Sequence, residues 1–553
     1  MPDAAEQKLP KEEPAFTPAS LATLVGVPVL LGVFLRSSYD GVARAVLWYA
    51  APAAALVLLA VCLLARRRGR VRLLGELLLP TAMLAAVAAM LAWNRLHHWL
   101  KDAQGLNHEV FRPAFDRPWA PLYARVGDSP PAAWAGVILA TAVAVAAVSR
   151  WPVHRRPTVG RWSAAACGFV ALAAIFAASE RTAEGAVRLT SHTPHHDLFL
   201  QDRPHFAGLA DVLPNYVQRM PQLQWFGAHY PPGNLLLLWA ERNWGITGAV
   251  WWLSVGGTAA GVFFVLLIGR DLGFSPAQRN ASGLLYLSTG GLLTYATINT
   301  TALLALPAAA AAWCFLRAAG GTTRTPARVA RGYGRKGDIR CIGFGVGLGF
   351  VMALFAMLSF SVTVFGLLLA VWGVAGVLSG RLSAAAVLQA VGVSLATFVL
   401  LLAGLWSGTG FNWLASLHTA VTAHDAQQAG SAFAHPLRWF VRSSGNLLAY
   451  GVSVLPVAVL AAAAAARARL QWRQDAALSV AAVATLVFVS FSGLFYMETE
   501  RVFAFFTPVL AVAGGGLLGG RFCQPGNPHV VRLYAVTALI LAATAELLLL
   551  HHL

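Results

Sequence analysis

Long apolar stretches, separated by short polar or basic segments, recur along the chain from Leu21 to Leu550. Many reach about 18 residues, the length that an α-helix needs to cross the hydrocarbon core of a bilayer. The pattern predicts an all-α polytopic membrane protein with about 13–15 transmembrane helices. The expected spans are roughly 19–36, 43–64, 73–93, 131–148, 161–178, 247–269, 281–316, 341–358, 362–379, 383–405, 445–466, 476–495, 502–519 and 533–550.

The composition agrees with this prediction. Of the 553 residues, 58% are hydrophobic and 12% are charged, and the mean hydropathy is +0.62. A soluble chain of this length would need more charge to cover its surface. The net charge of +18 lies mostly in short loops, as in membrane proteins, so we expect membrane lipids and not nucleic acid as its surroundings. The five cysteines include no Cys-x-x-Cys pair and predict neither a disulfide framework nor a zinc site.

Basic residues predict which loops face the cytoplasm. By the positive-inside rule, these loops are the arginine-rich segments 66–72, 150–161, 324–340 and 467–473. The opposite side then receives segments 94–130, 179–230, 406–444 and 496–501. The polar residues 1–18 are expected to form a cytoplasmic tail, because no signal-peptide pattern follows them. The high Ala, Arg and Gly content is typical of a bacterial protein, so we expect a multi-pass protein of the bacterial inner membrane.

One stretch does not fit a simple count of crossings. Between the outer loop ending near Tyr230 and the basic loop at Arg324 the number of crossings must be odd. The sequence offers four apolar pieces there: 232–243, 247–269, 281–296 and 299–316. One of them must be a half-helix or a re-entrant segment. The first is the main suspect, because 12 residues make about 18 Å of helix against a core of about 30 Å.

The outer segment 179–230 concentrates ionisable residues. A connection of this length without a role is uncommon. Residues 206–226 carry apolar side chains at helical spacing, which predicts an amphipathic helix on the membrane surface. The carboxylates are Glu180, Glu184, Asp197, Asp202 and Asp211, and the histidines are His192, His195, His196, His205 and His229.

These residue types allow several kinds of chemistry. A carboxylate at the membrane surface can act as a general base on an acceptor hydroxyl. The neighbouring His195, His196 and Asp197 could bind a divalent cation (Mg²⁺ or Mn²⁺), orient the base or hold a phosphate. A single histidine in such a loop is more often a solvated residue. Within the spans, acids are scarce apart from Glu76, Glu241 and Glu546, which weighs against a proton-coupled carrier. We expect Glu76 and Glu546 to be paired or near an interface.

The order of motifs in this loop resembles that of the GT-C fold glycosyltransferases that use polyprenyl-phosphate sugars (the PMT/ArnT-like superfamily). Those families place an acidic catalytic residue after a transmembrane helix, then surface helices, then a His-x-Pro-Pro-like motif that opens the next helix. Here the order is His196-Asp197-Leu198, the amphipathic segment, and His229-Tyr230-Pro231-Pro232-Gly233-Asn234. The tyrosine before the prolines departs slightly from the commonest form.

A second similarity lies near the C-terminus. The run from Met497 to Phe503, followed by Pro508, is similar to a Glu-Arg-x-x-x-aromatic-x-x-Pro pattern of some bacterial members. An arginine there is suited to phosphate oxygens. The alternative is that Glu500 and Arg501 only cap a helix and pair with each other.

The resemblance covers roughly 160–553 and implies a GT-C-like bundle. It implies that 19–159 is an additional N-terminal unit, that 179–233 is the external catalytic loop and that 318–340 is a cytoplasmic basic loop. It assigns the catalytic base to Asp197, with Glu180 and Asp211 as alternatives. It places Arg501, His229 and His196 at the donor phosphate, and His195, Asp202, Tyr230 and Glu500 at the acceptor cleft.

The implied activity is an inverting transfer of a hexosyl or pentosyl group. The donor would be a polyprenyl-phosphate sugar, and the acceptor a lipid or a glycan on the non-cytoplasmic side. The resemblance fixes no cofactor, and a divalent cation (Mg²⁺ or Mn²⁺) stays an open alternative. The rival interpretations are a flippase or transporter for a lipid-linked saccharide, and a polysaccharide polymerase or ligase. A flippase needs a polar path through the bundle, whereas a transferase needs only an outer cleft.

Overall fold

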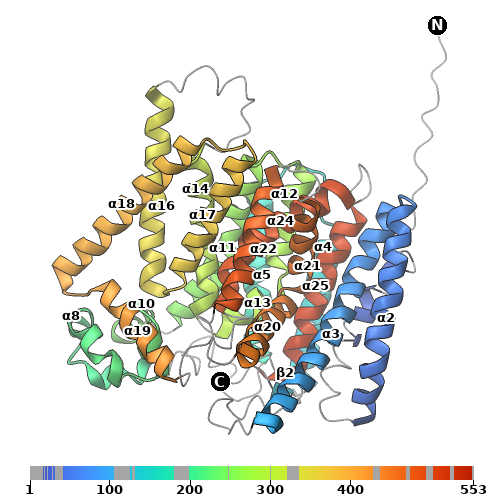
Figure 1. The fold of residues 1–553 in the computed structure, drawn as a ribbon, viewed down its shortest axis with the longest axis horizontal. Helices are drawn as coiled ribbons and strands as arrows, with labels where there is room; N and C mark the ends of the chain where they lie inside the picture. The colour runs from blue at the N-terminus through green and yellow to red at the C-terminus, as the bar shows by residue number, and fades with distance from the viewer. Residues whose placement is uncertain are drawn as a thin grey trace.

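A computed structural model describes most of the chain as a bundle of helices (Figure 1). The described residues are 17, 19–20, 23–27, 29–30, 41–104, 125–126, 131–179, 199–246, 248–298, 300–320, 335–427, 436–468, 474–492, 502–522 and 528–550.

Helices account for nearly all regular structure in the described part of the chain. The longer N-terminal helices are α2 (Gly41–Arg67), α3 (Val71–Gln104), α4 (Pro131–Ser149) and α5 (Val159–Ser179). Short elements follow: the 3-10 turns η2 (Arg203–His205) and η3 (Met220–Gln222), and the helices α8 (Leu209–Arg219), α9 (Trp225–His229) and α10 (Gly233–Trp244). Next come α11 (Ala249–Asp271), α12 (Pro276–Leu287), α13 (Gly290–Ile298), the 3-10 turn η4 (Thr300–Leu304) and α14 (Ala305–Ala318).

The C-terminal half continues in the same way. Its helices are α16 (Arg335–Leu358), α17 (Val362–Leu378), α18 (Ala384–Thr409), α19 (Trp413–Gln427), α20 (Pro436–Ser453), α21 (Leu455–Ala468), α22 (Gln474–Phe491), the 3-10 turn η6 (Phe503–Phe506), α24 (Thr507–Leu517), the π-turn η7 (Leu518–Phe522) and α25 (His529–Leu548). Extended pairing between described residues is limited to a two-residue antiparallel ladder of β1 (Arg125–Val126) with β2 (Leu549–Leu550).

The predicted polytopic membrane fold is confirmed. Within the described residues, eight helices are long and apolar enough to cross a bilayer, and a ninth is possible if the bent pair α20 and α21 forms one span. Four shorter apolar helices, parts of α4, α17, α22 and α25, accompany them. Side chains such as Trp162, Trp251 and Phe365, which are buried to 2% exposure or less, fill the centre of the bundle.

The basic helix ends lie together at one end of the bundle. Arg317 at the end of α14 contacts Asp271 at the end of α11, with 2.7 Å between Nε and Oδ2. Asn280 in the first turns of α12 donates to the carbonyl oxygens of Val153 and Arg155, in the α4–α5 loop. This clustering is what the positive-inside pattern requires. The short helices α8, α10 and α19 lie at the opposite end (Figure 1).

The structure accounts for the irregular stretch between Tyr230 and the basic loop. Helix α10 has 12 residues and is not one of the candidate spans. The rod formed by α12 and α13 starts at the basic end and reaches the other end, where Thr297 accepts a hydrogen bond from Trp251 Nε1 at the start of α11. Three rods, α11, α12 with α13, and η4 with α14, therefore run along the bundle. Of the four expected pieces, only α11 and the η4–α14 segment are long and apolar enough to be candidate spans, whereas α10, α12 and α13 are each shorter.

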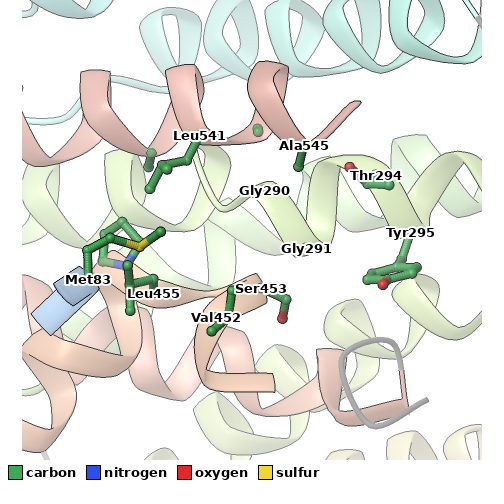
Figure 2. A pocket seen from close by; sticks show the side chains of 13 residues that line it. Met83, Gly290, Gly291, Thr294, Tyr295, Val452, Ser453, Leu455, Leu541 and Ala545 are labelled. Carbon is green, nitrogen blue, oxygen red and sulfur yellow. The ribbon is translucent and has the colours of Figure 1, made fainter. Parts of the chain in front are cut away.

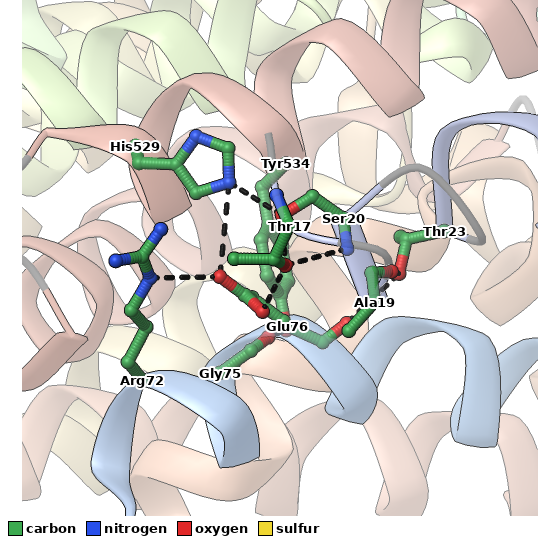
Figure 3. Close-up of polar contacts among 9 residues, drawn as sticks. All are labelled: Thr17, Ala19, Ser20, Thr23, Arg72, Gly75, Glu76, His529 and Tyr534. Carbon is green, nitrogen blue, oxygen red and sulfur yellow. Dashed lines mark hydrogen bonds and ion pairs between the residues drawn. The ribbon is translucent and has the colours of Figure 1, made fainter. Parts of the chain in front are cut away.

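Glu76 lies in a buried polar cluster at the basic end (Figure 3). Its side chain is 2% exposed and pairs with Arg72 at 3.0 Å between Oε1 and Nε. Thr17 donates to Oε2 at 2.8 Å, and His529 Nε2 lies 3.7 Å from Oε1. Ser20 Oγ is 2.6 Å from the same histidine nitrogen. The expectation that Glu76 is paired is confirmed, and the pairing ties the segment around residue 20 to α3 and α25.

Candidate functional site

The described part of the outer segment 179–230, which begins at residue 199, and α10 after it form a layer of short helices. The predicted amphipathic segment 206–226 forms α8 and η3. Its apolar face turns inward, with Val212, Tyr216 and Met220 fully buried. Ser416 of α19 donates to Met220 Sδ at 3.2 Å, so α19 covers this face.

The Pro231-Pro232-Gly233-Asn234 motif forms the junction between α10 and α16. A side chain at Gly233 would overlap the carbonyl oxygen of Met357, so glycine is needed for this close approach. Asn234, 2% exposed, donates to the carbonyl oxygen of Leu358 at 3.0 Å. It accepts from Thr300 Oγ1 at 2.8 Å. The motif therefore locks the start of α10 to two other elements.

Aromatic contacts connect residues 199–206 to this junction. The rings of Phe199 and Tyr230 meet edge to face, with centroids 5.8 Å apart. Phe206 packs against Trp239 of α10 at 6.5 Å between ring centroids. The guanidinium of Arg203 lies 5.2 Å from the centroid of the Trp239 ring, a distance typical of cation–π contacts. Among the described residues, no carboxylate pairs with Arg203.

Asp202 occupies a different position from the one expected of a cleft residue. Its side chain is 0% exposed, and Oδ1 accepts from the amide of Gln224 at 2.7 Å. Burial raises the pKa of Asp202 to about 6, an effect that the Gln224 amide, His205 and the Gly227 amide partly offset. A carboxyl group enclosed in this way contacts the chain itself and has no surface for an acceptor.

The other described site candidates lie at the surface of this layer. Asp211 accepts from the amide of Ala207 at 2.9 Å and from Asn215 Nδ2, one turn further along α8. These bonds fit a carboxylate in the first turn of a helix. His229 ends α9, and Tyr230 follows it directly; both are half-buried. Tyr230 contacts Phe199, and the predicted roles of His229 and Tyr230 stay predictions.

Six of the predicted site residues lie outside the described residues: Glu180, His195, His196, Asp197, Glu500 and Arg501. Their predicted roles, and the predicted metal ligands His195, His196 and Asp197, stay predictions. Within the described ranges, no group of three or more His, Cys, Asp or Glu side chains could hold a metal ion.

Sequence reasoning missed the residues that shape the layer. Tyr216 was assigned only to an apolar helix face, yet its hydroxyl donates to two carbonyl oxygens, of Gly227 at 2.9 Å and Tyr230 at 3.0 Å. A tyrosine in place of an aliphatic residue at a buried helical position was the signal, because a buried phenol needs a hydrogen-bond partner.

A cavity of about 70 Å³ lies deeper in the bundle, where two helix breaks meet. One break separates α12 from α13. The other is the 110° bend between α20 and α21. Figure 2 shows the side chains around α13 that line the cavity. None of them is charged: Met83, Gly290, Gly291, Thr294, Tyr295, Val452, Ser453, Leu455, Pro456, Ala538, Leu541, Ala542 and Ala545.

Comparison with known proteins yields only distant likenesses. No protein-family profile matches the chain, and no curated protein matches it. Structures of an oligosaccharyltransferase from Archaeoglobus fulgidus resemble it. The complex with zinc and sulfate has a TM-score of 0.42 and 16% identity, over 69% of this chain and 53% of that one. The form tethered to an acceptor peptide with the NVT sequon has a TM-score of 0.43 and 13% identity, over 69% and 55%. The archaeal oligosaccharyltransferase AglB from the same organism, in complex with an inhibitory peptide and a dolichol-phosphate, has a TM-score of 0.41 and 14% identity, over 69% and 56%. The chain spans about half the length of these proteins, and likenesses at this level assign no family.

Proposed function

We propose that the chain is a membrane glycosyltransferase that transfers a sugar from a polyprenyl-phosphate donor to an acceptor hydroxyl at the loop end of the bundle. The observation that carries this proposal is the contact of Phe199 with Tyr230, 5.8 Å between ring centroids. It joins Phe199, which follows the His195-His196-Asp197 cluster in the sequence, to the His-Tyr-Pro-Pro-Gly-Asn motif, at the end of the bundle opposite the basic residues. The motif order and this contact support one shared site.

Asp197 is the proposed general base. It precedes Phe199 by two residues in the sequence. The base would take the proton from the acceptor hydroxyl as its oxygen attacks the anomeric carbon. The bond from that carbon to the phosphate oxygen breaks, and the polyprenyl phosphate leaves with the electron pair. One such displacement inverts the anomeric configuration.

Two arginines are proposed to stabilise the charge that develops on the phosphate. Arg203 is held over Trp239, and with no acid partner among the described residues it can offer its donors to an anion. Arg501, outside the described residues, is the second proposed cation. Arginine suits this role because its planar group makes two parallel hydrogen bonds to phosphate oxygens.

The test is transfer by the purified protein from a panel of radiolabelled polyprenyl-phosphate sugars to extracted membrane acceptors. We expect at least one donor to lose its label to a product, with no transfer by the Asp197→Asn variant. The variant should be expressed and inserted like the wild type. Full activity of Asp197→Asn would remove this residue from the base role, and a wild type that is inactive with every donor would contradict the proposal.

A second candidate, movement of a lipid-linked saccharide across the bilayer, has one observation in its favour. Helix breaks that meet at a cavity inside the bundle are a feature of transporters. Here the two breaks meet around Gly291 and Ser453: a Cβ atom at Gly291 would lie 3.1 Å from Ser453 Oγ. The lining carries no charge, whereas a path for a phosphorylated saccharide needs polar or charged groups. Transfer is therefore the better-supported function.

A further inference from the structure

The segment from Gln224 to Tyr230 is held by side chains on two sides. On one side Asp202 accepts the hydrogen bond of the Gln224 amide at 2.7 Å. On the other, the hydroxyl of Tyr216 donates to the carbonyl oxygens of Gly227, at 2.9 Å, and of Tyr230, at 3.0 Å. One carboxyl group thus binds the start of α9, and one phenol binds its middle and the residue after its end.

Both holding groups are themselves fixed. The ring of Tyr216 stacks on Phe206, with centroids 6.2 Å apart, and meets Phe411 edge to face at 6.1 Å. Burial raises the pKa of the Tyr216 phenol well above its usual range, so the hydroxyl keeps its proton and stays a donor. Neither Asp202 nor Tyr216 is exposed, so their bonds serve the chain and not a ligand.

Gly227 is the point where the two sides meet. Its carbonyl oxygen accepts from Tyr216, and its Cα faces Asp202 so closely that a Cβ atom would overlap Oδ2. A larger residue at this position would push the carboxyl group away from the Gln224 amide. The arrangement therefore depends on three residues that sequence motifs did not single out together.

We propose that Asp202 and Tyr216 are positioning residues that clamp the segment 224–230 and thereby fix His229 and Tyr230 at the site. This inference rests on the proposed function for its catalytic consequence, but the clamp itself is a structural claim. Neither residue touches the reacting atoms in this scheme. They act through the backbone that carries His229.

The clamp has a pH dependence whose sign follows from burial. The groups that face the Asp202 carboxyl are the amides of Gln224 and Gly227, the Tyr216 phenol of α8 and the His205 imidazole of its own turn. Burial raises the pKa of Asp202 from 3.8 to about 6, so the closed segment binds a proton more tightly than an open, solvated one does. The closed form therefore gains stability as pH falls through about 6 and loses it as pH rises.

The clamp is tested by hydrogen exchange of the 224–230 amides in the detergent-purified full chain. After correction for intrinsic rates, wild-type protection should rise about tenfold between pH 7.5 and pH 5. Asp202→Asn, which has no titratable group, should lose this pH dependence. Tyr216→Phe should exchange about 3- to 10-fold faster at all pH values, because the hydrogen bond that its one hydroxyl proton shares between two carbonyl oxygens is removed. Retained pH dependence in Asp202→Asn, or wild-type exchange in Tyr216→Phe, would overturn the clamp.

A glycine pair supplies the matched control. Gly227→Ala should increase exchange as Tyr216→Phe does. Gly208→Ala in the same layer should not, because no atom lies within 4 Å of its added Cβ and its φ of 178° is open to any residue. Equal exchange in the two alanine variants would contradict the proposed contact.

Transfer assays on the same variants separate the two claims. If the wild type transfers sugar, Tyr216→Phe should lower kcat at pH 7, and Asp202→Asn should flatten the pH profile near 6. Variants that loosen the segment yet transfer like the wild type would refute the positioning role. If the wild type transfers nothing while the exchange results hold, the proposed function fails and the clamp stands.

Discussion

Asn234 offers the sharpest test of how the loop end of the bundle is held together. Its amide nitrogen donates to the carbonyl oxygen of Leu358 at 3.0 Å, and its amide oxygen accepts from Thr300 Oγ1 at 2.8 Å. The side chain is 2% exposed. Asn234→Ala removes both bonds at once and leaves two groups of the neighbouring elements without this partner.

The size of the effect follows from these two bonds. A buried hydrogen bond contributes about 1 kcal/mol net, and bonds between membrane helices average about 0.6 kcal/mol. With some cost for the groups left behind, we expect Asn234→Ala to destabilise the protein by about 1–3 kcal/mol. If both bonds are already broken in the transition state of unfolding, each 1.4 kcal/mol of destabilisation makes inactivation about 10-fold faster.

The assay is the half-life of the folded, monodisperse protein in detergent at a fixed elevated temperature, because membrane proteins often unfold irreversibly. Asn215→Ala is the matched control, since that side chain bonds only within the surface of α8. A double-mutant cycle with Thr300→Val should show a coupling of about 0.5–1 kcal/mol. A half-life equal to that of Asn215→Ala, or a coupling of zero, would refute the proposed junction.

Two further predictions concern opposite ends of the bundle. Glu76→Gln should destabilise the protein by about 1–3 kcal/mol, because the buried ion pair with Arg72 is lost; a thermal half-life like that of the wild type would contradict this. Arg203→Ala should raise the KM for the polyprenyl-phosphate sugar about 10-fold or more, because a charge-assisted bond to phosphate is removed. Arg203→Lys should restore the wild-type KM only in part, because lysine cannot stack on Trp239 as a planar group. Donor kinetics unchanged in both arginine variants would exclude contact with the phosphate.

The periodicity of apolar residues was sufficient to predict the membrane fold. Helix α10, with 12 residues, is too short to cross a bilayer core, and the sequence already pointed to this segment. The break between α12 and α13 was not predicted. Its residues, Ser288 to Gly290, are small, and in the fold the neighbouring Gly291 packs closely against Ser453 at the bend between α20 and α21.

The site was predicted less completely than the fold. The Pro-Pro-Gly-Asn motif was interpreted as the start of a helix, which is correct, but its contacts with Met357 and Leu358 depend on residues more than 120 positions away. Asp202 was grouped with the exposed acids of the loop because local sequence carries no signal of burial. In the folded layer, Gln224 and Gly227 cover the carboxyl group, and Asp202 accepts the hydrogen bond of the Gln224 amide.

The most direct test of the central claim follows a lipid-linked sugar in proteoliposomes. A radiolabelled polyprenyl-phosphate sugar is supplied with an acceptor, and both its transfer to product and its movement between leaflets are measured for the wild type and Asp197→Asn. Label should pass to the acceptor in the wild type only, with no movement of the donor between leaflets in either protein. Donor movement between leaflets without any product, at equal rates in both proteins, would contradict it.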